Sequence, residues 1–281
     1  MPELPELQAL AEGLTGAVAG RAVLSARAHQ PHVLRTATPP LGDLVGRTVT
    51  RVWRRGKLVL LECGELTVVM HLMQGGRLGL VATTGRTPRN VALSVGLDGG
   101  EELRLREHGT EHRASAHVVA TARVGELPHV AGLGPEPLGL APDAWRDRLA
   151  ERPARLHTAL RDGHRVAGIG RAYASDIMWA ARLSPFARTD RLDDGAYAAI
   201  ARAADAVLTQ ALERARGRIT TSLPDREERV TAVHGHAGDP CLRCGRTLER
   251  VSFEGYELVY CPDCQTGGRV LADRRTSRFL R

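Results

Sequence analysis

Two cysteine pairs near the C-terminal end constrain the fold of this 281-residue chain more than any other feature. Cys241 and Cys244 form the first pair, Cys261 and Cys264 form the second, and sixteen residues separate them. This spacing supplies four thiolates for tetrahedral coordination of one Zn²⁺ ion and leaves no open position for catalysis. We therefore expect one structural zinc per chain, holding together a segment too short to build its own core.

The composition favours a polyanionic partner. The formal charge is +7, and basic proteins bind nucleic acid more readily than membranes. No run of 18 apolar residues and no secretory signal is visible, so we expect no membrane span and a cytoplasmic location. In that reducing compartment the paired cysteines indicate metal rather than disulfides. The fifth cysteine, Cys63, lies in an apolar segment and is expected in the core.

Lys57 is the single lysine among 39 basic residues. A chain that uses arginine for almost every positive charge keeps lysine where an amine or a compact point charge is needed. Arginine does not deprotonate in proteins, whereas an amine does. Lys57 is therefore a candidate site residue, and an ordinary surface lysine is the alternative.

The N-terminal stretch offers a second amine. Methionine is normally removed ahead of a small residue such as Pro2, which would leave a secondary α-amine with a pKa near ~8. Such an amine is nucleophilic at physiological pH and suits Schiff-base formation on a sugar aldehyde carbon, with Glu3 as a general acid. The stretch also fits a plain helix start, with an apolar stripe at Leu4, Leu7, Leu10, Ala11 and Leu14.

The pattern of apolar residues predicts two domains in an α+β chain. Residues 22–120 favour short strands in a β-sandwich or barrel, with the first helix packed against it. The predicted strands are 49–53, 58–61, 66–70, 91–97 and 117–122. The Gly- and Pro-rich segment 132–139 marks the break. Beyond it, helices are predicted from 141, at 154–161, at 171–183 and at 193–216, followed by a hairpin over 250–260.

Three polar segments are candidates for contact with phosphates. These are 71–77, 104–113 and 162–171, and the third carries two glycines directly ahead of a predicted helix N-terminus. Ordinary solvated loops and turns are the alternative for each.

Together these motifs resemble the formamidopyrimidine-DNA glycosylase/endonuclease VIII family over nearly the whole chain. The matching motifs are Pro2-Glu3-Leu4-Pro5-Glu6, Arg55-Gly56-Lys57, His71-Leu72, Leu133-Gly134-Pro135-Glu136-Pro137-Leu138, Ala167-Gly168-Ile169-Gly170 and the finger ending in Cys264-Gln265. The opening is closer to the formamidopyrimidine branch.

The resemblance implies an N-terminal β-sandwich with a leading helix, and a C-terminal helix–two-turn–helix domain with a four-cysteine zinc finger. The expected boundaries are 1–131 for the catalytic domain, 132–140 for a linker, 141–234 for the helical domain and 235–281 for the finger. Damaged double-stranded DNA would bind in the cleft between the domains to a monomer, with the target nucleotide flipped out.

The resemblance also implies roles for single residues. Pro2 would attack C1′ of the damaged nucleoside, Glu3 would move protons, and Lys57 would hold a phosphate and assist β-elimination. The implied DNA contacts are His71, Gln74, Arg113, His157, Arg171 and Tyr256.

Three of these positions, and the residue after Arg113, differ from the family pattern. Gln74 replaces a hole-filling methionine, Arg171 replaces an asparagine, and Tyr256 replaces the arginine that promotes δ-elimination. Ala114 follows Arg113 where a phenylalanine is expected. Two alternatives therefore stay open. One is a lesion-binding protein of this fold with reduced or lost catalysis, and the other is a glycosylase specialised for bulky or unusual adducts.

Overall fold

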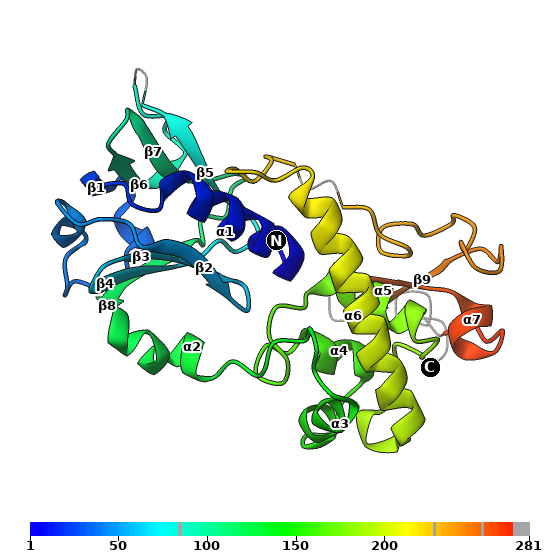
Figure 1. Cartoon of the computed structure of the whole chain (residues 1–281). Coiled ribbons are helices and arrows are strands. Elements are labelled where there is room, and N and C mark those ends of the chain that lie inside the picture. The colour runs from blue at the N-terminus through cyan, green and yellow to red at the C-terminus, as the bar shows by residue number, and fades with distance from the viewer. Residues whose placement is uncertain (84–85, 227–228, 254–255, 272–281) are drawn as a thin grey trace. The chain divides into compact units, whose positions relative to one another are not determined.

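The computed structural model describes residues 1–83, 86–226, 229–253 and 256–271. The chain forms two compact units (Figure 1). The first contains Met1–Gly132 and Leu212–Glu228, and the second contains Leu133–Ala211 and Arg229–Arg281. Across the described ranges, no helix combines the length and apolar character needed to cross a membrane.

The first unit is a β-sandwich led by a helix. Its helices are α1 (Leu4–Val18), η1 (Pro31–Val33), η2 (Leu41–Leu44), η3 (Thr121–Glu126) and α2 (Pro128–Ala131). Its strands are β1 (Val23–Ala28), β2 (Arg51–Arg55), β3 (Leu58–Cys63), β4 (Leu66–His71), β5 (Gly76–Ala82), β6 (Val91–Leu97), β7 (Glu101–Glu107) and β8 (Ser115–Ala120).

Two antiparallel four-stranded sheets make the sandwich, with strand orders β1-β6-β7-β5 and β2-β3-β4-β8. Their facing side chains form one core, to which Leu61, Val68, Val95 and Leu105 belong. Cys63 is fully buried in this core, as predicted, and burial raises the pKa of its thiol to about 12. It is therefore an inert packing residue.

Helix α1 covers the sandwich with the apolar stripe that the sequence predicted. Leu4, Leu10 and Leu14 are fully buried on it. Thr15 fastens the helix to strand β2, because its Oγ1 donates to the carbonyl of Val52 at 2.6 Å and accepts from the amide of Val52 at 2.9 Å.

Three strands of the sandwich, β1, β5 and β7, were not predicted. Arg104 and Arg106 lie in β7 rather than in a loop, where they alternate with the buried Leu103 and Leu105. A strand with one charged face shows this alternation of period two.

Strand β5 has a glycine at position 79 because a neighbouring segment approaches its backbone. A Cβ at Gly79 would lie 2.3 Å from the hydroxyl of Ser222. Leu80 N donates to the carbonyl of Thr221, and Leu223 N donates to that of Leu78. The segment after α6 therefore extends this sheet, which explains why residues 212–228 join the first unit. The predicted domain boundaries stay predictions, because compact units are defined by contacts and not by independent folding.

The second unit is mainly helical. It contains α3 (Pro142–Ala150), α4 (Leu156–Arg161), α5 (Arg171–Ala180), η4 (Thr189–Arg191), most of α6 (Asp194–Arg216), the hairpin of β9 (Glu249–Phe253) and β10 (Tyr256–Tyr260), and α7 (Pro262–Thr266). The predicted helices and hairpin are confirmed. The predicted turn at Glu254-Gly255 lies outside the described residues.

A compact turn joins α4 to α5. The carboxylate of Asp162 accepts from the amide of His164 at 3.0 Å and from Arg165 Nε at 3.2 Å. Gly168 has φ +85°, a left-handed conformation that glycine adopts without strain. Gly134 packs against the turn so closely that a Cβ there would lie 2.2 Å from the carbonyl oxygen of Arg165. The Gly- and Pro-rich segment therefore supports the turn as well as joining two parts of the chain.

Candidate active site

Pro2 and Glu3 lie directly before α1, and both are buried. Glu3 is the N-cap residue of the helix. It forms a capping box with Glu6, whose carboxylate accepts from the Glu3 amide at 2.9 Å. The start of α1 is thus held in a defined geometry. The two readings of the N-terminal stretch, helix start and reactive terminus, are compatible in this arrangement.

Lys57 lies in the turn between β2 and β3, and this turn is fastened to α1. Arg54 Nε donates to Gln8 Oε1 of the helix at 2.9 Å, and Arg54 Nη1 donates to the carbonyl of Gly56 at 3.2 Å. The lone lysine therefore belongs to a turn tied to α1, the helix that follows Pro2 and Glu3.

His71 ends strand β4 and is paired with Leu58, the residue after Lys57. Burial, and to a lesser extent the nearby Lys57 ammonium, lowers the pKa of His71 to about 4. The ring is therefore neutral at physiological pH, and its Nδ1 accepts from the amide of Met73 at 3.1 Å. His71 acts here as a neutral hydrogen-bonding group, and Lys57 supplies the positive charge beside it.

A cavity of about 570 Å³ opens beside the N-terminus. Met1, Gln74 and Arg113 line it, so the structure brings the residue next to Pro2 together with two of the predicted DNA contacts. The remaining lining residues are Met73, Gly75, Arg77, His108, Gly109, Thr110 and Glu111. Two segments supply nearly all of this wall, 73–77 and 108–113.

Glycines allow these two segments to meet. A Cβ on Gly75 would lie 2.4 Å from the carbonyl oxygen of His108, and one on Gly76 would lie 2.2 Å from that of Leu72. Neither distance is tolerated between real atoms, so these positions require glycine. The amide of His108 donates to the carbonyl of Gly75 at 3.0 Å, which joins the two walls of the cavity.

Arg77 positions the cavity wall rather than offering a free cation to phosphate, and this corrects our expectation for the segment 71–77. Its side chain is only 7% exposed. Its guanidinium donates to the carbonyls of Gln74, Gly76 and Pro224 at 2.8–3.0 Å. A sequence pattern cannot reveal this role, because Pro224 is 147 residues away.

Arg113 is exposed at the cavity, with Nε 3.3 Å from the carboxylate of Glu111. Ala114 is fully buried and does not line the cavity. Its amide donates to Glu107 Oε1 at 2.8 Å. The small side chain at 114 therefore adds no space to this cavity.

His157 was predicted to contact DNA, and the structure contradicts that prediction. Its side chain is fully buried in the second unit. Nδ1 lies 3.0 Å from the carbonyl oxygen of Pro185, Nε2 lies 3.1 Å from Thr158 Oγ1, and the Phe186 ring packs against it. Burial lowers the pKa of His157 to about 4. A neutral ring with both nitrogens engaged is a core residue.

Arg171 is the first residue of α5 and is exposed. The Gly168–Gly170 turn precedes it, so a cation lies at a helix N-terminus there. Tyr256, the remaining predicted contact, begins strand β10, and its side chain is not among the parts that the structure describes.

The four cysteines of the second unit come together as predicted. Their sulfurs lie 3.5 Å apart for Cys244 and Cys261, 3.5 Å for Cys244 and Cys264, and 4.0 Å for Cys241 and Cys264. Sulfurs at 2.3 Å from a tetrahedral zinc would lie about 3.8 Å from one another. The donor set and its dimensions therefore fit zinc. Trp179 of α5 donates to Cys241 Sγ at 3.3 Å, which joins the site to the helix that begins at Arg171.

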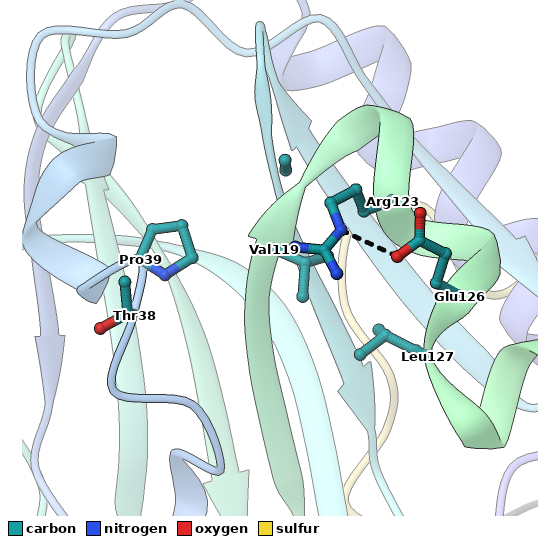
Figure 2. Close-up of a pocket in the computed structure, with 7 residues that line it drawn as sticks. Thr38, Pro39, Val119, Arg123, Glu126 and Leu127 are labelled. Carbon is teal, nitrogen blue, oxygen red and sulfur yellow. Dashed lines mark hydrogen bonds and ion pairs between the residues drawn. The ribbon is translucent and has the colours of Figure 1, made fainter.

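A second cavity of the first unit, of about 460 Å³, is shown in Figure 2. Thr38, Pro39, Val119 and Leu127 line it, and an ion pair of 2.8 Å joins Arg123 to Glu126 beside them. Its lining residues include none of the predicted catalytic residues or DNA contacts. We therefore place the candidate active site at the cavity beside Met1.

Three family models match consecutive parts of the chain. The formamidopyrimidine-DNA glycosylase N-terminal domain matches residues 1–110, and the formamidopyrimidine-DNA glycosylase H2TH domain matches residues 133–223. A zinc finger found in FPG and IleRS matches residues 238–267.

Curated relatives match over most of the chain. The formamidopyrimidine-DNA glycosylase of Geobacter sulfurreducens is 33% identical, with 94% of this chain and all of that protein covered. A formamidopyrimidine-DNA glycosylase-like protein of Mycobacterium tuberculosis is 38% identical over 55% of this chain and 98% of its own length.

Solved structures share the fold. A Lactococcus lactis FPG variant in complex with Fapy-dG containing DNA has a TM-score of 0.85 at 23% identity, covering 94% of this chain and 100% of that one. A complex of Lactococcus lactis Fpg with abasic site containing DNA has a TM-score of 0.82 at 23% identity, covering 94% and 99%. From its domain models and its full-length relatives, this chain belongs to the formamidopyrimidine-DNA glycosylase/endonuclease VIII family.

Proposed function

We propose that this protein is a bifunctional DNA glycosylase and abasic-site lyase whose nucleophile is the amine of Pro2, exposed by removal of Met1. The observation that carries the proposal is the position of Met1 in the wall of a 570 Å³ cavity that Gln74 and Arg113 also line. A terminus at Pro2 would open into this cavity. Family membership supplies the substrate class, which is damaged double-stranded DNA.

The chemistry follows from the two residues that begin α1. The lone pair of the Pro2 nitrogen forms a bond to C1′ of a flipped-out nucleotide while the glycosidic bond breaks and the base leaves. The nitrogen then loses its proton, the bond from C1′ to the ring oxygen O4′ breaks, and an open-chain iminium ion forms. Glu3 donates the proton that the departing base and sugar require and later shuttles protons during β-elimination. Its burial keeps this carboxyl group away from bulk water, where proton transfer would be uncontrolled.

Lys57 would hold a phosphate next to the reacting sugar and assist β-elimination, which cuts the strand 3′ to the lesion. A neutral His71 beside it leaves the positive charge concentrated on one ammonium group. Tyr256 replaces the arginine that the family resemblance associates with δ-elimination, so we expect a single cut at each abasic site.

In the second unit, Arg171 and the helix N-terminus at Gly170 would hold backbone phosphates. We infer that the four cysteines hold one structural zinc ion, which would orient the β9–β10 hairpin toward DNA. The protein would act as a monomer. The net charge of +7 predicts that binding weakens steeply as salt increases.

A panel of duplexes tests the proposal. Protein whose loss of Met1 has been verified by intact mass is incubated with duplexes carrying an abasic site, an oxidised purine, an oxidised pyrimidine or an alkylated base. We expect β-elimination product from the abasic duplex and base release from at least one lesion. A Glu3→Gln variant should lose base release by about 10²-fold or more, while it still cleaves the abasic duplex.

Two outcomes would count against this function. Tight binding to the abasic duplex with no product would indicate a lesion-binding protein without catalysis. Equal product from the processed protein and from protein that retains Met1 would show that the Pro2 amine is not the nucleophile.

A further inference from the structure

We propose that His32, Glu107 and His112 form a binding site for a divalent transition metal ion, separate from the four-cysteine site. Each of these residues offers one ligand atom, and the three atoms lie within 4.8 Å of one another. His32 Nε2 lies 3.3 Å from Glu107 Oε2, and His112 Nδ1 lies 4.0 Å from the same oxygen. All three residues belong to the first unit.

Glu107 is the fixed member of this cluster. Its side chain is 1% exposed. Its amide donates to the carbonyl of Asn90 at 2.8 Å, and its Oε1 accepts from the amide of Ala114 at 2.8 Å. The second oxygen, Oε2, faces the two histidines. A buried carboxylate requires compensation by a positive charge or by hydrogen bonds, and a metal ion at Oε2 would supply the charge.

The two histidines are able to close on an ion. The side chains of His32 and His112 are each 39% exposed, so their rings can rotate by the small amount needed. Ligand atoms around a tetrahedral zinc lie about 3.4 Å apart, because Zn–N and Zn–O distances are near ~2.1 Å. The His32–Glu107 distance of 3.3 Å already matches, and His112 must approach by under an ångström.

The backbone supports both histidines. His32 lies in η1, the short helix that begins directly after Gln30. The amide of Gln30 donates to the carbonyl of Ala92 at 3.2 Å. His112 Nδ1 lies 3.3 Å from Gln30 Oε1, so Gln30 orients this ring before metal binding, and the hydrogen bond would break when Nδ1 gives up its proton to bind the ion. Gln30, His32 and His112 therefore meet although they come from segments more than 70 residues apart in sequence.

The donor set selects the kind of metal. Two imidazoles and one carboxylate suit Zn²⁺, Cu²⁺, Ni²⁺ and Fe²⁺, whereas Mg²⁺ and Ca²⁺ prefer oxygen ligands. Water would complete the coordination. Glu107 and His112 bracket the segment 108–111, which lines the cavity beside Met1. An ion at this site would therefore fasten one wall of that cavity to η1.

Calorimetric titration of Zn²⁺ into protein whose four-cysteine site is already loaded tests the proposal. We expect one further ion to bind per chain, and Mg²⁺ to produce no binding heat. Saturating zinc should raise the melting temperature of the first unit by roughly 5 °C.

A His32→Gln/His112→Gln variant should weaken the added binding by about 100-fold or more, since outer-sphere partners alone contribute 10–100-fold. The matched control is His117→Gln/His129→Gln, which removes another histidine pair, with ring centroids 4.4 Å apart. That pair belongs to no metal-binding cluster found among the described residues. The control should bind the added zinc as the unaltered protein does.

A spectroscopic readout keeps the test independent of variant folding. Cu²⁺ bound to the unaltered, zinc-loaded protein should show magnetic coupling to two imidazole nitrogens. The proposal is overturned if no ion binds beyond the finger zinc. It is also overturned if both histidine variants bind alike, or if the copper spectrum reports oxygen ligands alone.

Discussion

The β-sandwich and the four-cysteine finger differ in what holds them together. The sandwich core includes side chains from α1 and from both sheets, such as Leu10, Leu61 and Leu105. The buried cluster of the finger, as far as the structure describes it, consists of Val233, Cys241, Leu248, Val259 and Cys261. Two of these five residues, Cys241 and Cys261, belong to the proposed zinc site.

Because of this difference, the geometry of the proposed active site should not depend on the stability of the finger. The proposed nucleophile and its cavity belong to the unit that is stabilised by apolar burial, so they do not require the finger metal for their geometry. We expect the finger to require the proposed zinc for its own folding and to affect the reaction only through DNA binding. Substitutions in one unit should therefore leave the other folded.

The largest expected effect is loss of the finger metal. Cys244→Ser should release zinc and unfold the finger, because structural zinc contributes about 10 kcal/mol or more to the folding of such segments. Trp179 fluorescence should change, since its indole N–H donates to Cys241. Zinc content, fluorescence and a separate melting transition of the sandwich are the measurements.

Cys63→Ser is the matched control for that experiment. It places a hydroxyl in the sandwich core and should destabilise the first unit by roughly 1–3 kcal/mol while the zinc content is unchanged. If Cys244→Ser melted the sandwich as well, the separation of the two units would be wrong.

Removal of the Lys57 amine should have the next largest effect. Lys57→Ala should reduce strand cleavage by about 10³-fold, with the melting temperature little changed. Lys57→Arg keeps a positive charge and should recover phosphate binding, but a guanidinium does not reproduce the compact ammonium. Single-turnover cleavage of an abasic duplex provides the comparison. Cleavage by Lys57→Ala at the normal rate would remove this residue from the mechanism.

Gly75→Ala should have a smaller effect that is confined to the cavity. The added Cβ would lie 2.4 Å from the carbonyl oxygen of His108, so the two walls must separate. A displacement of about 1 Å near reacting groups costs up to ~10²-fold in rate. Gly16→Ala in α1 is the control, because its Cβ would meet nothing within 4 Å. Equal activity of the two variants would show that the cavity is not the active site.

The smallest expected effect concerns pH. The pKa of His157 is lowered to about 4, so the unfolded chain binds more protons than the folded chain between pH ~6.5 and ~4. Stability contributed by the neutral ring is present above pH ~6.5 and is lost as pH falls toward ~4. Between pH 7.5 and 5, the free energy of unfolding of the second unit should therefore fall less in His157→Gln than in the unaltered protein, by on the order of 1 kcal/mol.

Denaturant midpoints at the two pH values measure this difference, and His71→Gln provides the equivalent variant in the first unit. If the denaturant midpoint of His157→Gln changed with pH as much as that of the unaltered protein, the buried ring would not control the pH dependence.

The sequence predicted the features that depend on local spacing. Spacing or periodicity within one segment predicts each of these features. They are the cysteine pairs, the hairpin between them, α1 with its buried leucines and the helices from α3 to α6. Family resemblance correctly predicted the order of the domains.

Contacts between distant segments could not be predicted. Strand β5 was not predicted, and the residue that packs against its Gly79, Ser222, is far away in sequence. The sequence suggested that Arg77 could contact a phosphate. In the structure its guanidinium donates to the carbonyl of Pro224, 147 residues away. His157 was assigned by alignment with family members, and its burial depends on Pro185 and Phe186.

The central claim is that the amine of Pro2 forms the covalent bond to DNA. Protein without Met1 is mixed with an abasic duplex and borohydride, and the trapped complex is digested and sequenced by mass spectrometry. The account predicts a reduced sugar adduct on the nitrogen of Pro2 and no trapped complex when Met1 is retained. An adduct on Lys57, or no adduct with processed protein, would contradict it.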